Sequence, residues 1–205
     1  EDVGSYGVYL LGVDGLKFES NTIGSSPYGA AGIHIIGHNA YMGQGNGSCT
    51  GIGEYVSSNN DGPIVIKNNV ITDGSGLTIE GSGYCIDGNT LSGGAKMLFA
   101  ATSYNGGATP TSHIISNNVI SGTYDPGMYF SNADGNTITS NTIKDNKAGI
   151  RLAGSDNNTI SGNTITNNKP SNFGLSGTSL AMAIGTCDNN TISNNQITNN
   201  SQGIE

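Results

Sequence analysis

An aspartate, a tyrosine and an arginine near the middle of the chain are residue types that can act on acidic sugars. Tyr129 and Arg151 occupy the same place in two successive copies of a short apolar, any, apolar phrase, and Asp125 stands just before the first copy. A tyrosine hydroxyl can transfer a proton, an arginine can neutralise a uronate carboxylate, and an aspartate can assist. These residues therefore indicate a polysaccharide lyase or C5-epimerase acting on uronate polymers as one candidate function.

The middle residue of each copy of this phrase is expected to face outward. Successive copies then form a linear row along which a polymer could bind. The row reads Tyr9, His34, Thr78, Leu98, Tyr129, Arg151 and Met182. Four of its members are the candidate glycan-binding residues: Tyr9, His34, Tyr129 and Arg151. The alternative is that the tyrosines fill the pleated surface or a lateral contact between rods. The other histidines, His38 and His113, lack metal-ligand spacing.

A second series carries negative charge. Asp134, Asp156 and Asp188 each fall seven residues before a repeated asparagine, and each is followed by Gly or Asn. This pattern is typical of turn aspartates whose carboxylate bonds the backbone. The alternative is a column of calcium ions bridging them, because hard cations prefer such oxygens. We expect no cofactor, with calcium as the alternative.

The three cysteines leave several pairings open. Cys85 and Cys187 occupy corners about four turns of the predicted fold apart, roughly 19 Å, so they cannot pair within one copy. Cys49 can form a disulfide with Cys85, which leaves Cys187 unpaired, or it can form one with Cys187 of a stacked neighbour. Three buried thiols are the third interpretation.

These residues are positioned by a repeat. A six-residue phrase occurs seven times, with an asparagine in its fourth place, an apolar residue three positions before the asparagine and another two positions after it. Its asparagines are Asn21, Asn69, Asn89, Asn118, Asn141, Asn163 and Asn195. Each copy follows one copy of the apolar, any, apolar phrase, so two phrases per turn are expected to form one coil of a solenoid. We expect the asparagines to tolerate a left-handed conformation at each corner and to stack as an amide ladder.

The period-two alternation within short runs rich in Gly, Asn, Ser and Thr predicts strands rather than helices. The predicted fold is an all-β, right-handed parallel β-helix of about seven to eight coils, as one domain over residues 1–205. Coils about 4.8 Å apart give a rod on the order of 35 Å long. The spacing places loop insertions at residues 37–62 and 101–112, and a third between Asn163 and Ala181.

The runs at residues 157–165 and 189–195 resemble the repeats of NosD-like periplasmic and surface proteins. The resemblance implies a right-handed parallel β-helix. It also implies kinship with polysaccharide lyases, alginate epimerases, phage tailspikes and archaeal surface or adhesin-like proteins. Asp125-Pro126 resembles the start of the Asp-Pro-His-Asp motif of mannuronan epimerases, but Gly127 and Met128 replace its histidine and second aspartate.

The composition of the chain limits the classes of partner that it can bind. A net charge of −8 without a basic cluster argues against nucleic acid, and no apolar stretch is long enough to span a membrane. The chain opens at Glu1-Asp2, as a processed mature protein would, which favours an extracellular or cell-surface location. Four sequons are candidate glycosylation sites, although chance matches are expected in this composition: Asn46, Asn157, Asn189 and Asn199.

The first and last phrases lack an obvious cap, which suggests that the open ends of copies pair with each other, or alternatively that the chain is a fragment of a longer solenoid. We therefore expect an extracellular structural protein that stacks into a surface layer, sheath or filament, and not an enzyme. Its main partner would be itself, with glycans as a further partner. A lyase or epimerase and a glycan-binding module of a larger adhesin are the alternatives.

Overall fold

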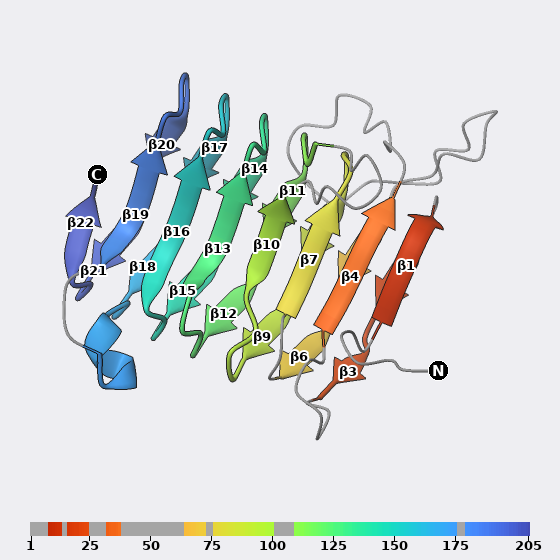
Figure 1. Ribbon diagram of the computed structural model, residues 1–205, viewed down its shortest axis with the longest axis horizontal. Coiled ribbons are helices and arrows are strands. Elements are labelled where there is room, and N and C mark those ends of the chain that lie inside the picture. The colour runs from red at the N-terminus through yellow and green to blue at the C-terminus, as the bar shows by residue number, and fades with distance from the viewer. Residues whose placement is uncertain are drawn as a thin grey trace.

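The protein is a right-handed parallel β-helix, as predicted. The computed structural model describes residues 8–13, 16–24, 32–37, 64–72, 76–100, 109–175 and 179–205, with the backbone alone for residues 9–13 and 32–37. Its strands stack into three sheets that run along the rod, and β1 and β22 lie at opposite ends of the long axis (Figure 1). Seven coils of three strands are followed by β22, which confirms the predicted number of coils.

Sheet 1 contains the longer strands. It comprises β1 (Val8–Val13), β4 (Gly32–Gly37), β7 (Gly76–Glu80), β10 (Met97–Ala100), β13 (Pro126–Ser131), β16 (Ala148–Ala153), β19 (Leu180–Gly185) and β22 (Gln202–Ile204). Sheet 2 comprises β2 (Lys17–Glu19), β5 (Val65–Lys67), β8 (Cys85–Asp87), β11 (Ile114–Ser116), β14 (Thr137–Thr139), β17 (Thr159–Ser161) and β20 (Thr191–Ser193). Sheet 3 comprises β3 (Thr22–Ile23), β6 (Val70–Thr72), β9 (Thr90–Ser92), β12 (Val119–Ser121), β15 (Thr142–Lys144), β18 (Thr164–Thr166) and β21 (Gln196–Thr198).

Each coil has three strands and contains one copy of each phrase, as expected. The asparagine phrase is not one strand but the end of a sheet 2 strand, a corner, and the start of a sheet 3 strand. In the fifth coil, for example, Asn141 lies between β14 and β15. The asparagine breaks the run because its side chain is needed at the corner.

Single apolar residues from sheets 2 and 3 fill the core. The central residue of each three-residue strand points inward, and the register stacks identical types, as in Ile138, Ile160 and Ile192. Sheet 1 adds two larger columns, in which the Phe99 and Phe130 rings stack with their centroids 4.5 Å apart. Stacking like side chains at the strand spacing keeps the interior closely packed.

The close approach of coils requires glycine at one point in sheet 1. A Cβ atom added to Gly149 would lie 2.1 Å from the carbonyl oxygen of Ala181 and 2.7 Å from Cγ2 of Ile165. The "small" position before the sheet 1 phrase therefore reflects steric exclusion by the next coil.

Two of the predicted insertions fall largely outside the described residues. The third contains the short 3-10 helix η1 (Pro170–Phe173), and its Phe173 ring contacts the Tyr124 ring at 4.3 Å between centroids. The described coils form one continuous stack (Figure 1). A single domain over the whole chain stays a prediction.

Candidate functional site

The outer row of sheet 1 runs through adjacent strands of six coils. The register pairs Tyr9 with His34, and then continues through Thr78, Leu98, Tyr129 and Arg151. Only the backbone is described at Tyr9 and His34. The seventh member is Ala183, not Met182, because Arg151 pairs with Ala183. Met182 pairs with Ile150 and is fully buried, so its assignment to the outer row was wrong.

Tyr129 and Arg151 lie side by side on the outer face. The Arg151 guanidinium carbon sits 5.0 Å from the centroid of the Tyr129 ring, within the range of a cation–π interaction. Arg151 is exposed, and no carboxylate of the described residues forms an ion pair with it. The Arg151 guanidinium is therefore stabilised by the Tyr129 ring rather than neutralised by a carboxylate of the described residues.

Asp125 is engaged elsewhere. Its carboxylate accepts a hydrogen bond from the Lys96 ammonium group at 2.5 Å, and its backbone N–H donates to the Thr123 hydroxyl. The acid of the candidate catalytic group thus forms a salt bridge with the preceding coil. Tyr129 and Arg151 contact each other on the strands, and among the described residues Asp125 makes no hydrogen bond or ion pair with either of them.

A groove of about 810 Å³ follows this face toward the last coils. Polar and charged residues line it, including Asp125, Lys147, Arg151, Ser179, Gln202 and Glu205. Its lining also includes the small residues Ala153 and Ala183. The short side chain of Ala183, beside Arg151, leaves this part of the sheet uncovered.

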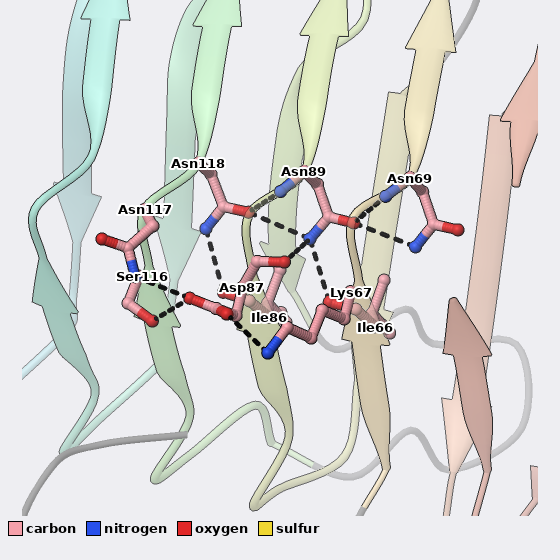
Figure 2. A network of polar contacts seen from close by, with 9 residues as sticks. All are labelled: Ile66, Lys67, Asn69, Ile86, Asp87, Asn89, Ser116, Asn117 and Asn118. Carbon is pink, nitrogen blue, oxygen red and sulfur yellow. Dashed lines mark hydrogen bonds and ion pairs between the residues drawn. The ribbon is translucent and has the colours of Figure 1, made fainter. Parts of the chain in front are cut away.

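The predicted asparagines form a continuous ladder at the corner between sheets 2 and 3. In each step the side-chain Oδ1 accepts the backbone N–H and the Nδ2–H of the asparagine in the preceding coil, as between Asn118 and Asn141 at 2.9 and 3.0 Å. The same pair of bonds joins all seven residues from Asn21 to Asn195. Figure 2 shows three of them, Asn69, Asn89 and Asn118, in line. The bonds satisfy side chains that are buried over most of the ladder.

The left-handed residue at this corner is not the ladder asparagine itself. It is the residue immediately before, such as Asn68 (φ 55°), Asn117 (φ 54°), Ser140 (φ 56°) and Gly162 (φ 65°). The expectation that the ladder asparagine adopts this conformation was therefore wrong. The preceding residue turns the chain, which points the asparagine side chain inward.

Two further ladders were missed by sequence reasoning. Asn136, Asn158 and Asn190 stack at the corner between sheets 1 and 2, and Asn146, Asn168 and Asn200 at the corner between sheets 3 and 1. Each follows a left-handed residue, as at the first corner. The signal was present in paired asparagines such as Asn157-Asn158 and Asn199-Asn200, whose first member has φ values of 57° and 54°.

His113 takes the place of an asparagine in the second ladder. Its Nδ1 accepts a hydrogen bond from the backbone N–H of Tyr84 at 3.1 Å, and the backbone N–H of His113 donates to Oδ1 of Asn136 at 2.9 Å. The ring packs against those of Tyr84 and Phe99, and Nε2 is buried without a hydrogen-bond partner. Complete burial lowers the pKa of His113 to about 3, against a smaller opposing effect of the Gly81 backbone. The imidazole is therefore neutral at ordinary pH.

Asp87 is a second polar node that the sequence did not indicate. Its carboxylate accepts hydrogen bonds from the Ser116 hydroxyl and the Asn117 amide, both at 2.8 Å, and lies 3.3 Å from the Lys67 ammonium (Figure 2). Burial raises the pKa of Asp87, but the hydrogen bonds from Asn117, Ser116 and Lys67 and the lysine charge outweigh it, so the pKa is lowered. Together these contacts join three coils on the outside of sheet 2.

The three candidate calcium ligands follow one another along the stack, and the carboxylates of two of them, Asp134 and Asp156, accept backbone hydrogen bonds. Oδ1 of Asp134 accepts the N–H of Asp156 at 2.8 Å, and Oδ1 of Asp156 accepts the N–H of Asp188 at 2.7 Å. Across the described ranges, no group of three or more His, Cys, Asp or Glu side chains is arranged to hold a metal ion.

The cysteines and sequons occupy separate places. Cys85 is disulfide-bonded and buried, Cys187 is a free thiol, and Cys49 lies outside the described residues. The Cys187 thiol donates to the Gly185 carbonyl and accepts the Ser155 N–H. Asn157, Asn189 and Asn199 are exposed left-handed residues, while Asn46 lies outside the described part of the chain.

Residues 2–179 match the family model described as periplasmic copper-binding protein (NosD). The chain belongs to the NosD family. This confirms the predicted relationship, although an archaeal character is not established by it. No curated protein and no solved structure matches the chain. Among the described residues of this NosD-family protein, no helix has the length and apolarity needed to cross a bilayer.

The described residues do not fit the copper named in the family description. The Nδ1 atom of His113 accepts a hydrogen bond from Tyr84, and its Nε2 is buried in a ring that packs against Tyr84 and Phe99. Cys187 lies in the last complete coil, far along the stack from His113. Copper sites require several imidazole or sulfur ligands around one point, and the described part of the chain brings no such set together.

Proposed function

We propose that this NosD-family protein is an extracellular structural protein whose copies stack end to end in a surface layer, sheath or filament. The observation that carries the proposal is the polarity of the asparagine ladder. Except at the two ends of the ladder, each Oδ1 accepts from the coil before it and each backbone N–H donates to the coil after it.

The two faces of the described stack are therefore complementary. At one end, Oδ1 of Asn21 receives no hydrogen bond from the described residues. At the other, the backbone N–H of Asn195 has no acceptor among them, although its Nδ2 donates to the Ile160 carbonyl. The last coil of one copy can thus supply the donor that the first coil of another accepts.

Apolar side chains support the same contact. Phe18 and Ile23 in the first coil, and Ile192 and Ile197 in the seventh, are only partly buried although their equivalents between are fully buried. Stacking two copies would remove these side chains from water and pair the edges of β20 and β21. A head-to-tail contact of this kind produces an open filament unless its rotation closes a ring.

The test uses negative-stain microscopy and sedimentation of the full chain over a range of concentrations. Ile197→Lys places a charge on the end face and should abolish assembly, whereas Thr198→Lys, exposed on the outer side of the same strand, should not. Circular dichroism and thermal melting establish that both variants fold. A monomer at all concentrations, or equal assembly by both variants, would overturn the proposal.

The proposed location is the periplasm or cell surface, in line with the description of the family. The ladders themselves suit this setting because they hold the coils together without metal or cofactor. Fractionation of the native cells, with detection of the protein outside the cytoplasmic membrane, tests it. The enzymatic alternative is less well supported, because the Asp125 carboxylate is held in a salt bridge with Lys96, whereas Tyr129 and Arg151 contact each other.

A further inference from the structure

We propose that the groove beside Arg151 binds an acidic saccharide chain, with the Arg151 guanidinium holding a sugar carboxylate. This site goes beyond the structural role and does not depend on it. The starting observation is an exposed arginine, lining a groove, that forms no ion pair among the described residues.

The chain carries few cations, which makes their placement informative. It has 7 Lys and Arg against 15 Asp and Glu, yet Lys147 and Arg151 both line the groove. The third cation of this face, Lys96, neutralises Asp125. Two acids also line the groove, but Asp125 is neutralised by Lys96, so Glu205 is the one acid of the lining set against the charges of Lys147 and Arg151.

Tyr129 prepares Arg151 for this contact. A guanidinium lying over an aromatic ring keeps its planar edge of N–H donors free, and that edge matches the two oxygens of a carboxylate. The ring also restricts the long arginine side chain, which reduces the entropy lost on binding. Tyr129 is therefore a positioning residue rather than a contact residue.

The rest of the lining matches a sugar better than a peptide or a nucleic acid. Ala153 and Ala183 provide small apolar surface for the C–H face of a pyranose, and Ser179, Thr186 and Gln202 offer groups that can bond hydroxyls. A nucleic acid requires many cations along its phosphate backbone, and the groove lining supplies only Lys147 and Arg151. Glu205, also in the lining, opposes a ligand carboxylate at its own end of the groove.

The test measures binding of hexagalacturonate to the full chain by isothermal titration calorimetry. The neutral comparison is its fully methyl-esterified form, and the non-sugar comparison is hexaglutamate. We expect binding of hexagalacturonate only. Arg151→Ala should weaken it by about tenfold or more, because a charge-assisted hydrogen-bonded pair is lost. Glu205→Gln should strengthen it.

Matched variants separate the site from general charge. Lys147→Gln should weaken binding, whereas Lys169→Gln, which makes the same change at the equivalent corner of the next coil but outside the groove, should not. Tyr129→Phe keeps the ring and should bind as the parent does, while Tyr129→Leu should lose affinity. Thermal melting establishes that each variant folds.

Several outcomes would overturn the proposal: no binding of hexagalacturonate, unchanged binding by Arg151→Ala, equal binding of hexaglutamate or the ester, or equal losses in Lys147→Gln and Lys169→Gln. A loss in Tyr129→Phe equal to that in Tyr129→Leu would refute the positioning role of the ring. None of these measurements requires the copies to stack.

Discussion

The imidazole of His113 replaces an asparagine amide in accepting the backbone N–H of Tyr84, at 3.1 Å. The substitution works because Nδ1 of a neutral ring has a lone pair where the amide has Oδ1. It also places a buried titratable group in a ladder whose other side chains are amides.

We expect the free energy of unfolding to fall as the pH is lowered from about 6.5 toward 3. The folded pKa of His113 is about 3 and the usual value is 6.5, so between them the unfolded chain binds the proton and the folded chain does not. This stability is fully present above about pH 6.5 and is lost toward the folded pKa, with a slope of at most about 1.4 kcal/mol per pH unit. Urea unfolding across this range measures it.

His113→Asn restores the residue type of the other ladder positions and should remove this contribution to the slope. If the variant and the parent lose stability in parallel between pH 6.5 and 3, the assignment to His113 is wrong.

Replacing a ladder asparagine in the middle of the stack should be strongly destabilising. Asn141→Leu removes the acceptor of two hydrogen bonds from Asn118 and leaves those buried donors unpaired. We expect a loss of about 3 kcal/mol or more in the free energy of unfolding. Asn157→Gly, at an exposed left-handed position, is the control and should change stability little. Similar losses in both variants would show that the ladder contributes no special stability.

Adding one methyl group at Gly149 should destabilise the protein more than adding it at Gly185. The new Cβ would meet the Ala181 backbone at Gly149, whereas nothing lies within 4 Å at Gly185. Overpacking of this kind costs about 1–3 kcal/mol. Thermal melting of Gly149→Ala and Gly185→Ala compares them, and equal melting temperatures would contradict the close approach of these coils.

Asp87→Asn should reduce stability at neutral pH by removing the carboxylate that binds Lys67, Ser116 and Asn117. Because the folded pKa of Asp87 is lowered, its contribution is present above the usual value of 3.8 and is lost as the pH falls through the folded pKa. The difference between parent and variant should therefore shrink in acid. A difference that stays constant at low pH would argue against ionisation of Asp87 as its cause.

The sequence was sufficient for the architecture because the repeat reports it directly. Apolar residues such as Ile138 and Ile160 recur at the spacing of a coil, and the asparagine between strands marks a corner. It was not sufficient to count the strands per coil, because Asn141 interrupts two strands of only three residues each, which read as one phrase.

The register of the seventh coil was misread for a related reason. Leu180 to Ile184 is apolar throughout, so alternation cannot distinguish Met182, which points inward, from Ala183, which points outward. The contacts of Asp87 and Asp125 could not be predicted from the sequence either. These contacts depend on the distance between side chains in neighbouring coils, and the repeat pattern of the sequence does not give that distance.

The constant geometry of the corners makes the coil an interchangeable module. Ladder partners in the fifth and sixth coils are 22 residues apart, as in Asn141 and Asn163 or Asn136 and Asn158. Excising residues 141–162 would bring Asn163 into the place of Asn141, with Ser140 still supplying the left-handed turn before it. Proteins of this design can therefore lengthen or shorten by duplicating or deleting whole turns of chain, while each remaining turn keeps its neighbours' hydrogen bonds.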